Sequence, residues 1–284
     1  MQPYVTYIDN VTQHMIVEQY NGVIWVQINN DTDFGSGGSG LNAPQIDFDN
    51  TGKLYIAFDD SNTSDITTSI KKYDGESWNY LGMPGLNESS YTSNPVLKIN
   101  PNNNIPYIAF YNLNSSSRIE VMQFDGINWQ YVGNHDSIPK SNGSISLTFD
   151  PTDNQPIIAY TNILSASVAT VSVLQYNSTN WVYVGAQNFN SSSPSNQTAQ
   201  VQIEFNPISH QPYVLFQDFG SYNTIVKYFD GTNWLTFGEA DFSALYSLPD
   251  TGWFGMHFGN DGRLYVAFTS RSNSIEPIGV MSYK

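Results

Sequence analysis

A repeat of about fifty residues is the feature that most constrains the fold of this chain. An aromatic residue followed by Asp or Asn, Gly or Ser, two variable residues and Trp occurs five times, and the tryptophans are 51 to 53 residues apart. These tryptophans are Trp25, Trp78, Trp129, Trp181 and Trp234. A second, apolar segment occurs six times, at 3–9, 54–60, 106–112, 156–162, 212–218 and 264–270. The chain is therefore built from one supersecondary unit used several times.

Each unit reads as four short strands, which we call A, B, C and D. In one unit they are Pro-Gln-Ile-Asp-Phe, Leu-Tyr-Ile-Ala-Phe, Ser-Ile-Lys-Lys-Tyr and Trp-Asn-Tyr-Leu-Gly. Strands A and C alternate apolar and polar residues, whereas strand B is apolar throughout, which is typical of a strand covered on both faces. Asn, Asp and Gly punctuate the A–B and C–D connections and favour tight turns. Four antiparallel strands in a fifty-residue repeat predict a β-propeller.

The number of repeated segments predicts six blades. Strands B and C can be placed six times and strands A and D five times, so strand A is missing from the first blade and strand D from the last. We expect an all-β, six-bladed β-propeller in a single domain, 1–284, with incomplete end blades. A five-bladed ring ranks second because it would leave one B and one C strand over. The open end blades also suggest a possible homo-oligomer formed by strand addition.

Charge and composition exclude several classes of protein. The chain has 10 basic and 25 acidic residues and a net charge of −15, so a nucleic-acid partner, which needs clustered Lys and Arg, is not expected. No stretch approaches 18 consecutive apolar residues, so membrane insertion is not expected. Cys is absent, which excludes disulfides and a thiol nucleophile. No His-Glu-x-x-His motif or close His pair indicates a metal, and no motif indicates a cofactor.

The location is predicted from glycosylation sequons. Residues 1–20 have neither a basic nor an apolar leader region, so no signal peptide is expected in the numbered chain. The chain carries Asn-x-Ser/Thr sequons, which can also arise by chance in a chain so rich in Asn, Ser and Thr. They are Asn10, Asn30, Asn62, Asn87, Asn114, Asn142, Asn177, Asn190 and Asn196. We expect an extracellular or cell-surface glycoprotein.

A candidate site follows from the lengths of the connections. The A–B and C–D turns are short and uniform, whereas the B–C and D–A loops at the other end of the blades are long and differ between blades, as binding loops do. We therefore expect ligand contacts from six residues of that end. They are Trp253, Tyr91, His135, Arg118, Tyr246 and Asp60. Asp60 ends a B strand in register with Asp9, Asn112, Asn162 and Asp218, and these side chains either cap the B–C loops or surround a cation.

The repeated tryptophans have two interpretations. Because they recur in every unit, we expect them to pack between blades. The alternative is one sugar-stacking site per blade.

The repeats resemble those of known propeller families. The segments 44–58 and 118–126 resemble the NHL-type repeat, and the Asp-Gly-x-x-Trp-x-x-Val-Gly ending is similar to tectonin-like repeats of surface propellers. The resemblance covers almost the whole chain and implies propeller architecture. It implies little about function, because propellers host lectins, enzymes and scaffolds. The repeats place Phe or Tyr where NHL repeats tend to have Asp.

The residue types favour recognition rather than catalysis. The chain has 16 Phe, 19 Tyr and 6 Trp but only 12% charged residues. It has no Gly-x-Ser-x-Gly elbow, and its three Arg are too scattered for the triad of a sialidase. Aromatic stacking with amide and hydroxyl hydrogen bonds is how proteins bind neutral sugars. We expect a non-catalytic, lectin-like, carbohydrate-binding module. The alternatives are a structural or adhesion protein that binds another protein, and then a polysaccharide-acting enzyme.

Overall fold

The computed structural model describes most of the chain, in fourteen stretches. They are 2–9, 11–30, 34, 44–60, 67–87, 92–113, 118–134, 137–141, 143–165, 168–192, 200–217, 224–238, 251–270 and 278–283. The chain divides into two compact units, Met1–Pro139 and Lys140–Lys284. In the described part no helix is both long and apolar enough to cross a bilayer.

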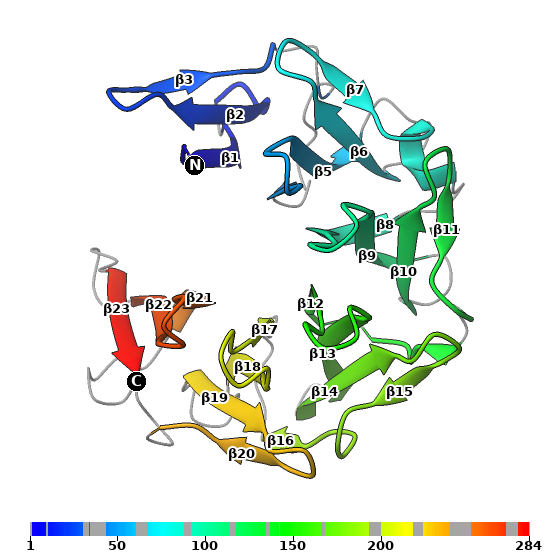
Figure 1. The fold of residues 1–284 in the computed structure, drawn as a ribbon, viewed down its shortest axis with the longest axis vertical. Coiled ribbons are helices and arrows are strands. Elements are labelled where there is room, and N and C mark those ends of the chain that lie inside the picture. The colour runs from blue at the N-terminus through cyan, green and yellow to red at the C-terminus, as the bar shows by residue number, and fades with distance from the viewer. Residues whose placement is uncertain are drawn as a thin grey trace. The chain divides into compact units, whose positions relative to one another are not determined.

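The first unit contains three antiparallel sheets, which we call blades 1 to 3 (Figure 1). Blade 1 consists of β1 (Tyr4–Ile8), β2 (Met15–Tyr20) and β3 (Trp25–Gln27). Blade 2 consists of β4 (Gln45–Phe48), β5 (Leu54–Asp60), β6 (Thr67–Tyr73) and β7 (Trp78–Tyr80), and a 3₁₀ turn, η1 (Pro84–Asn87), follows it. Blade 3 consists of β8 (Thr92–Ile99), β9 (Pro106–Asn112), β10 (Arg118–Phe124) and β11 (Trp129–Tyr131).

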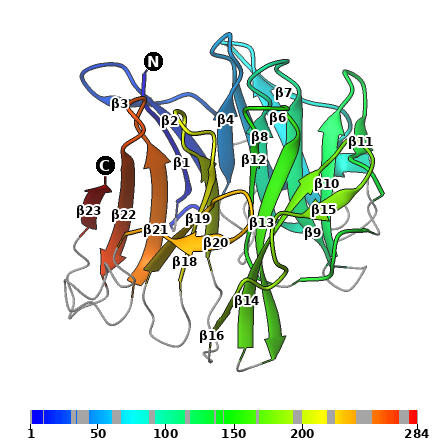
Figure 2. The same ribbon diagram turned by 60° about the horizontal axis from the view of Figure 1, so that its bottom comes forward.

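The second unit contains blades 4 to 6. Blade 4 consists of β12 (Ile145–Phe149), β13 (Pro156–Ser165), β14 (Val168–Tyr176) and β15 (Trp181–Tyr183), with β16 (Asn190–Ser192) paired to β14. Blade 5 consists of β17 (Val201–Phe205), β18 (Pro212–Gln217), β19 (Thr224–Phe229) and β20 (Trp234–Thr236). Blade 6 consists of β21 (Thr251–Phe258), β22 (Leu264–Ser270) and β23 (Ile278–Tyr283). Figure 2 shows the long β13–β14 hairpin with β16 beside it.

These blades confirm the predicted all-β, six-bladed architecture. Every predicted A, B, C and D strand is present, and each D strand begins at the repeated Trp. Blades 1 and 6 have three strands, as expected. The B strands β5 and β9 are buried at all seven positions, which agrees with their apolar sequence. Within the described stretches, β16 and η1 are the elements that were not predicted.

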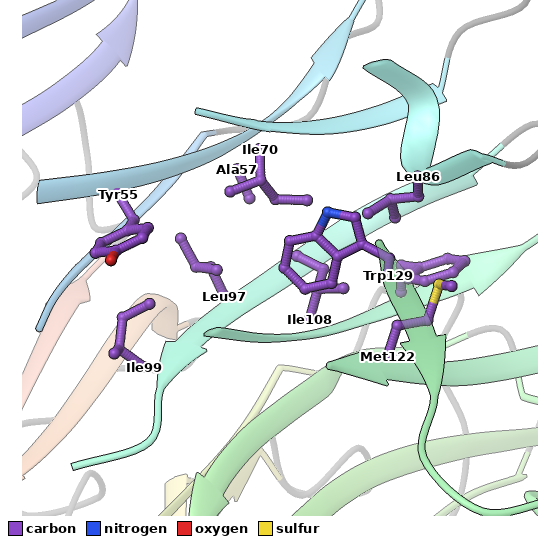
Figure 3. Packing of buried hydrophobic residues seen from close by; sticks show 10 residues of the cluster. Tyr55, Ala57, Ile70, Leu86, Leu97, Ile99, Ile108, Met122 and Trp129 are labelled. Atoms are coloured by element: carbon purple, nitrogen blue, oxygen red, sulfur yellow. The ribbon is translucent and has the colours of Figure 1, made fainter. Parts of the chain in front are cut away.

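The repeated tryptophans join neighbouring blades within each unit. Their indole N–H groups donate to the carbonyl at the end of the preceding D strand. The bonds run from Trp78 to Ile28 (3.3 Å), from Trp129 to Leu81 (2.8 Å) and from Trp234 to Val184 (2.8 Å). Figure 3 shows the buried cluster around Trp129, to which blades 2 and 3 both contribute. The packing interpretation is therefore confirmed for the buried Trp78, Trp129 and Trp234. Trp181 is buried against Tyr176 of its own blade, and Trp25 is 43% exposed.

A glycine lies beside two of the packed indoles, Gly82 beside Trp129 and Gly185 beside Trp234. Gly185 has φ +71°, and a Cβ there would lie 2.8 Å from Phe229 Cε2 and 3.1 Å from Trp234 Cδ1. We expect Gly185→Ala to lower the free energy of unfolding by about 2–4 kcal/mol, because it adds overpacking to backbone strain. The matched control is Gly126→Ala, which has φ +104° but open space around its Cβ. Urea unfolding measures both, and equal losses would contradict a packing role for Gly185.

The C–D turns are held by carboxylates that accept backbone hydrogen bonds. Bonds from the Ser77 and Glu76 N–H groups lower the pKa of Asp74 to about 2. Bonds from the Asn128 and Ile127 N–H groups lower the pKa of Asp125. Those from Asn233 and Thr232 lower the pKa of Asp230. The blade 4 turn has Asn177 in this place, and its side-chain oxygen accepts the same two bonds.

These turns predict acid sensitivity. A carboxylate whose pKa falls on folding stabilises the fold above its unfolded pKa of about 3.9 and loses this contribution as pH falls through the folded pKa. We therefore expect the melting temperature to drop between pH 4 and pH 2. The triple variant Asp74→Asn, Asp125→Asn, Asp230→Asn should lose less over that interval, because an amide oxygen accepts the same bonds at every pH. An equal loss in thermal melts of both proteins would contradict this role.

Candidate ligand-binding site

Polar side chains gather where strand B ends and strand C begins. In blade 2, Ile56 pairs with Lys71, Asp60 pairs with Thr67, and Lys71 pairs with Tyr80. Because side chains alternate between the faces of a sheet, Asp60, Lys71 and Tyr80 share one face. This end of the blade leads into the B–C loop.

In blade 2, a tyrosine hydroxyl is held by a buried carboxylate. The Tyr80 hydroxyl donates to Asp60 Oδ2 at 2.8 Å. The Lys71 ammonium lies 4.2 Å from the centre of the Tyr80 ring and 5.5 Å from that of Phe34, a cation–π arrangement. Asp60 and Lys71 are buried, whereas Tyr80 is 36% exposed. The part of this cluster that solvent reaches is therefore the tyrosine.

Blade 3 has a related cluster with different charges. The Asn112 amide donates to both Glu120 oxygens at 3.2 Å, and the Tyr131 hydroxyl donates to Glu120 Oε2 at 3.3 Å. Arg118 pairs with Asn112 across the sheet and precedes Glu120 by two residues, so its side chain lies on the same face. Glu120 and Asn112 are buried, while Arg118 and Tyr131 are half-buried. The tyrosine is again partly exposed, whereas Nε and Nη1 of the Arg118 guanidinium are buried.

We call these two clusters the tyrosine–carboxylate sites. The blade 2 site consists of Asp60, Lys71 and Tyr80, and the blade 3 site consists of Asn112, Arg118, Glu120 and Tyr131. Each combines an aromatic surface with hydrogen-bonding groups whose positions are fixed by neighbours.

The residues in register with Asp60 are Asn162 in blade 4 and Asp218 in blade 5, and Asp218 lies outside the described residues. In blade 4 the Tyr160 and Tyr183 hydroxyls lie 3.3 Å apart. In blade 5 Lys227 takes the place of Lys71, since it pairs with Val214 as Lys71 pairs with Ile56. Its ammonium donates to Thr236 Oγ1 at 3.3 Å, and burial lowers its pKa. The side chains at these equivalent positions thus differ from blade to blade, although the strands pair in the same way.

Of the six predicted ligand-binding residues, two have side chains in the described part of the structure. Asp60 and Arg118 both lie in tyrosine–carboxylate sites, but in different blades, so they do not form one site. Tyr91, His135 and Tyr246 lie outside the described residues. Trp253 lies in β21, and its side chain is likewise outside the described part.

The cation interpretation of the B-strand ends gains no support. Asp60 accepts a hydrogen bond from Tyr80 instead. In the described ranges no three His, Cys, Asp or Glu side chains group as a metal site would require.

Sequence reasoning missed Lys71, Tyr80, Glu120 and Tyr131. A usable signal was present, because the third residue of the D strand is Tyr in three successive blades: Tyr80, Tyr131 and Tyr183.

Three of the sequons can be placed. Asn30 and Asn177 are exposed, and Asn190 is half-buried in β16. Asn10, Asn62, Asn114, Asn142 and Asn196, together with the side chain of Asn87, lie outside the described part.

The chain is similar in fold to several solved structures. One is the fucose-specific lectin of Aleuria aurantia, at TM-score 0.56 and 14% identity, covering 98% of this chain and 90% of the lectin. A second structure of that lectin, described as a six-bladed β-propeller, gives TM-score 0.57. The structure of AofleA from Arthrobotrys oligospora gives a TM-score of 0.55 at 9% identity. The match covers 100% of this chain and 83% of the AofleA chain. No family model and no curated protein matches the chain. The fold class is therefore a six-bladed β-propeller, while the NHL-type or tectonin-like assignment rests on the repeats alone.

Proposed function

We propose that this protein is a non-catalytic, glycan-binding propeller that holds sugars at its tyrosine–carboxylate sites. The observation that carries the proposal is the solvent-accessible tyrosine whose hydroxyl a buried carboxylate fixes, in two successive blades. A ring held in this way offers a flat apolar surface to a sugar without losing further side-chain entropy on binding. The half-buried Arg118 places a positive charge on the same face of blade 3 as Glu120 and Tyr131.

The comparisons support the same class of ligand. A structure of the Aleuria aurantia lectin is described as a complex with α-methyl-L-fucoside, and another as a complex with Fucα1-6GlcNAc. At 14–16% identity these proteins share a fold with this chain, and the fold is one on which sugar sites are built.

A glycan array tests the proposal. We expect retention on a defined subset of neutral glycans, with fucosylated structures as the first set to examine. A blank array with folded protein would favour the alternative of a protein-binding adhesion module. Turnover of an immobilised polysaccharide would favour an enzyme instead.

We also propose that the protein acts outside the cell or at its surface. The exposed sequon side chains Asn30 and Asn177 support this location, because each lies where a glycan would extend into solvent. Secretion from a eukaryotic host followed by glycosidase treatment tests it. A mass decrease is expected, and an unchanged mass would argue against modification.

A further inference from the structure

Blade 4 has uncharged polar side chains on the face that carries the tyrosine–carboxylate sites in blades 2 and 3. Tyr183 is the third residue of β15, as Tyr80 is of β7. It pairs with Leu174, and Ser172, two residues earlier on β14, pairs with Tyr160. Because side chains alternate between the faces of a sheet, Tyr160, Ser172 and Tyr183 share one face. Tyr160 and Ser172 are fully buried, and Tyr183 is half-buried.

The connection between β15 and β16 brings an amide onto this face. Asn188 Oδ1 accepts hydrogen bonds from the Thr170 hydroxyl at 2.8 Å and from the Ser172 hydroxyl at 3.2 Å. The Asn188 backbone N–H donates to Ser172 Oγ at 2.9 Å. Both hydroxyl residues are buried, Asn188 is half-buried, and no described residue accepts from its Nδ2 group. The structure thus fixes the amide by its oxygen and leaves its two N–H donors for a ligand.

Asn188 stands where blade 2 has a glycine. Gly85 donates its N–H to Ser69 Oγ at 2.9 Å, just as Asn188 donates to Ser172. Gly85 has φ +78° and Asn188 has φ +52°. This left-handed backbone favours glycine, and Asn is one of the few other residues that adopt it readily. Because blade 2 makes the same contact without a side chain, the turn does not require the amide of Asn188.

We propose that the half-buried Asn188 and Tyr183 of blade 4 bind the acetamido group of a neutral 2-acetamido sugar. The inference rests on the proposed glycan-binding function and adds a third site to it. Asn188 Nδ2 donates to the carbonyl oxygen of the acetamido group, and the Tyr183 ring packs against its methyl group.

This ligand differs from that of the tyrosine–carboxylate sites. Blade 2 has Gly85 in place of Asn188, and in blade 3 the Asn112 amide already donates to Glu120. The acetamido sugar is therefore a ligand of blade 4, and a glycan selected by the tyrosine–carboxylate sites reports on blades 2 and 3.

A matched pair of ligands tests the blade 4 site. They are the β-methyl glycosides of N-acetylglucosamine and of glucose, which differ in carrying an acetamido or a hydroxyl group at C2. The protein is the full chain with Tyr80→Ala and Tyr131→Ala, which leaves blade 4 unchanged, and calorimetric titration measures binding. We expect saturable binding of the N-acetylglucosaminide with the affinity of the parent chain. The glucoside should bind at least about tenfold more weakly.

Two substitutions of Asn188 separate the amide donor from the turn. Asn188→Gly keeps the left-handed backbone that Gly85 has in blade 2, and Asn188→Asp keeps the acceptor oxygen but has no N–H donor. We expect both variants to fold and to bind the N-acetylglucosaminide at least about tenfold more weakly. The matched control is Asn154→Gly, which replaces another left-handed Asn, φ +63°, in the A–B turn of the same blade. It should bind as the parent does.

The outcomes distinguish this site from the proposed function. Equal binding of the two glycosides, or undiminished binding by folded Asn188→Gly and Asn188→Asp, would overturn the acetamido site. Failure of the N-acetylglucosaminide to bind, while the parent chain retains the glycan that the array selects, would overturn it and leave the tyrosine–carboxylate sites standing. Failure of every glycan to bind the folded parent chain would overturn both.

Discussion

Trp129→Ala should lower the free energy of unfolding by about 3–5 kcal/mol, the range for removing a large buried aromatic side chain. The Trp129 side chain is 3% exposed and packs in a cluster with Leu86, Ile108 and Met122. Its N–H bond to the Leu81 carbonyl joins blade 3 to blade 2, so the substitution removes packing and also leaves a part-buried acceptor without this donor. Urea unfolding followed by circular dichroism measures the change.

The chain supplies its own control for this prediction. Trp25 occupies the same repeat position but is 43% exposed, because no blade precedes blade 1 in its unit. We expect Trp25→Ala to cost about 1 kcal/mol or less. Equal losses at the two positions would contradict the conclusion that the repeated indole acts by packing between blades.

Tyr131→Ala should abolish sugar binding at the blade 3 site. The half-buried ring packs on the cluster around Trp129 and is partly exposed, and its hydroxyl donates to Glu120. Tyr131→Phe keeps the ring but loses the bond to Glu120, so we expect an intermediate loss of about fivefold to tenfold, as removal of one hydrogen bond at a binding site gives. Calorimetric titration with the best array glycan measures both variants.

A remote tyrosine controls for indirect effects. Tyr265 is 38% exposed on β22, close to the value for Tyr80, but lies outside the tyrosine–carboxylate sites. Tyr265→Ala should bind glycan like the parent protein. A comparable loss in this variant would show that the effect of Tyr131→Ala is general rather than local.

The strands could be predicted because each repeat carries sequence signals at its strand boundaries. Asp or Asn with Gly marks the C–D turn, Trp begins strand D, and an apolar run identifies strand B, so five or six copies of each signal reinforce one another. β16 lacks such a signal: Asn190–Ser192 is polar and forms a strand only because β14 is long enough to pair with it. At β16, pairing with β14 therefore decides the structure, and the local sequence does not.

The site was harder to predict because it depends on register. Asp60 and Arg118 could be identified from their places at strand ends. The partner of Asp60, Tyr80, lies 20 residues away in the chain, and Glu120 is joined to Asn112 and Tyr131, eight and 11 residues away. The pairing of strands B, C and D brings these side chains to the same face. A one-residue change of register would send these side chains to the opposite face. Composition carries no information on that register.

Calorimetric titration of one double variant tests the central claim most directly. The variant is Tyr80→Ala with Tyr131→Ala, compared with the parent protein on the glycan that the array selects. We predict saturable binding by the parent and none by the folded double variant. Undiminished binding by the double variant, or no glycan bound by the parent, would contradict the assignment of sugar binding to the tyrosine–carboxylate sites.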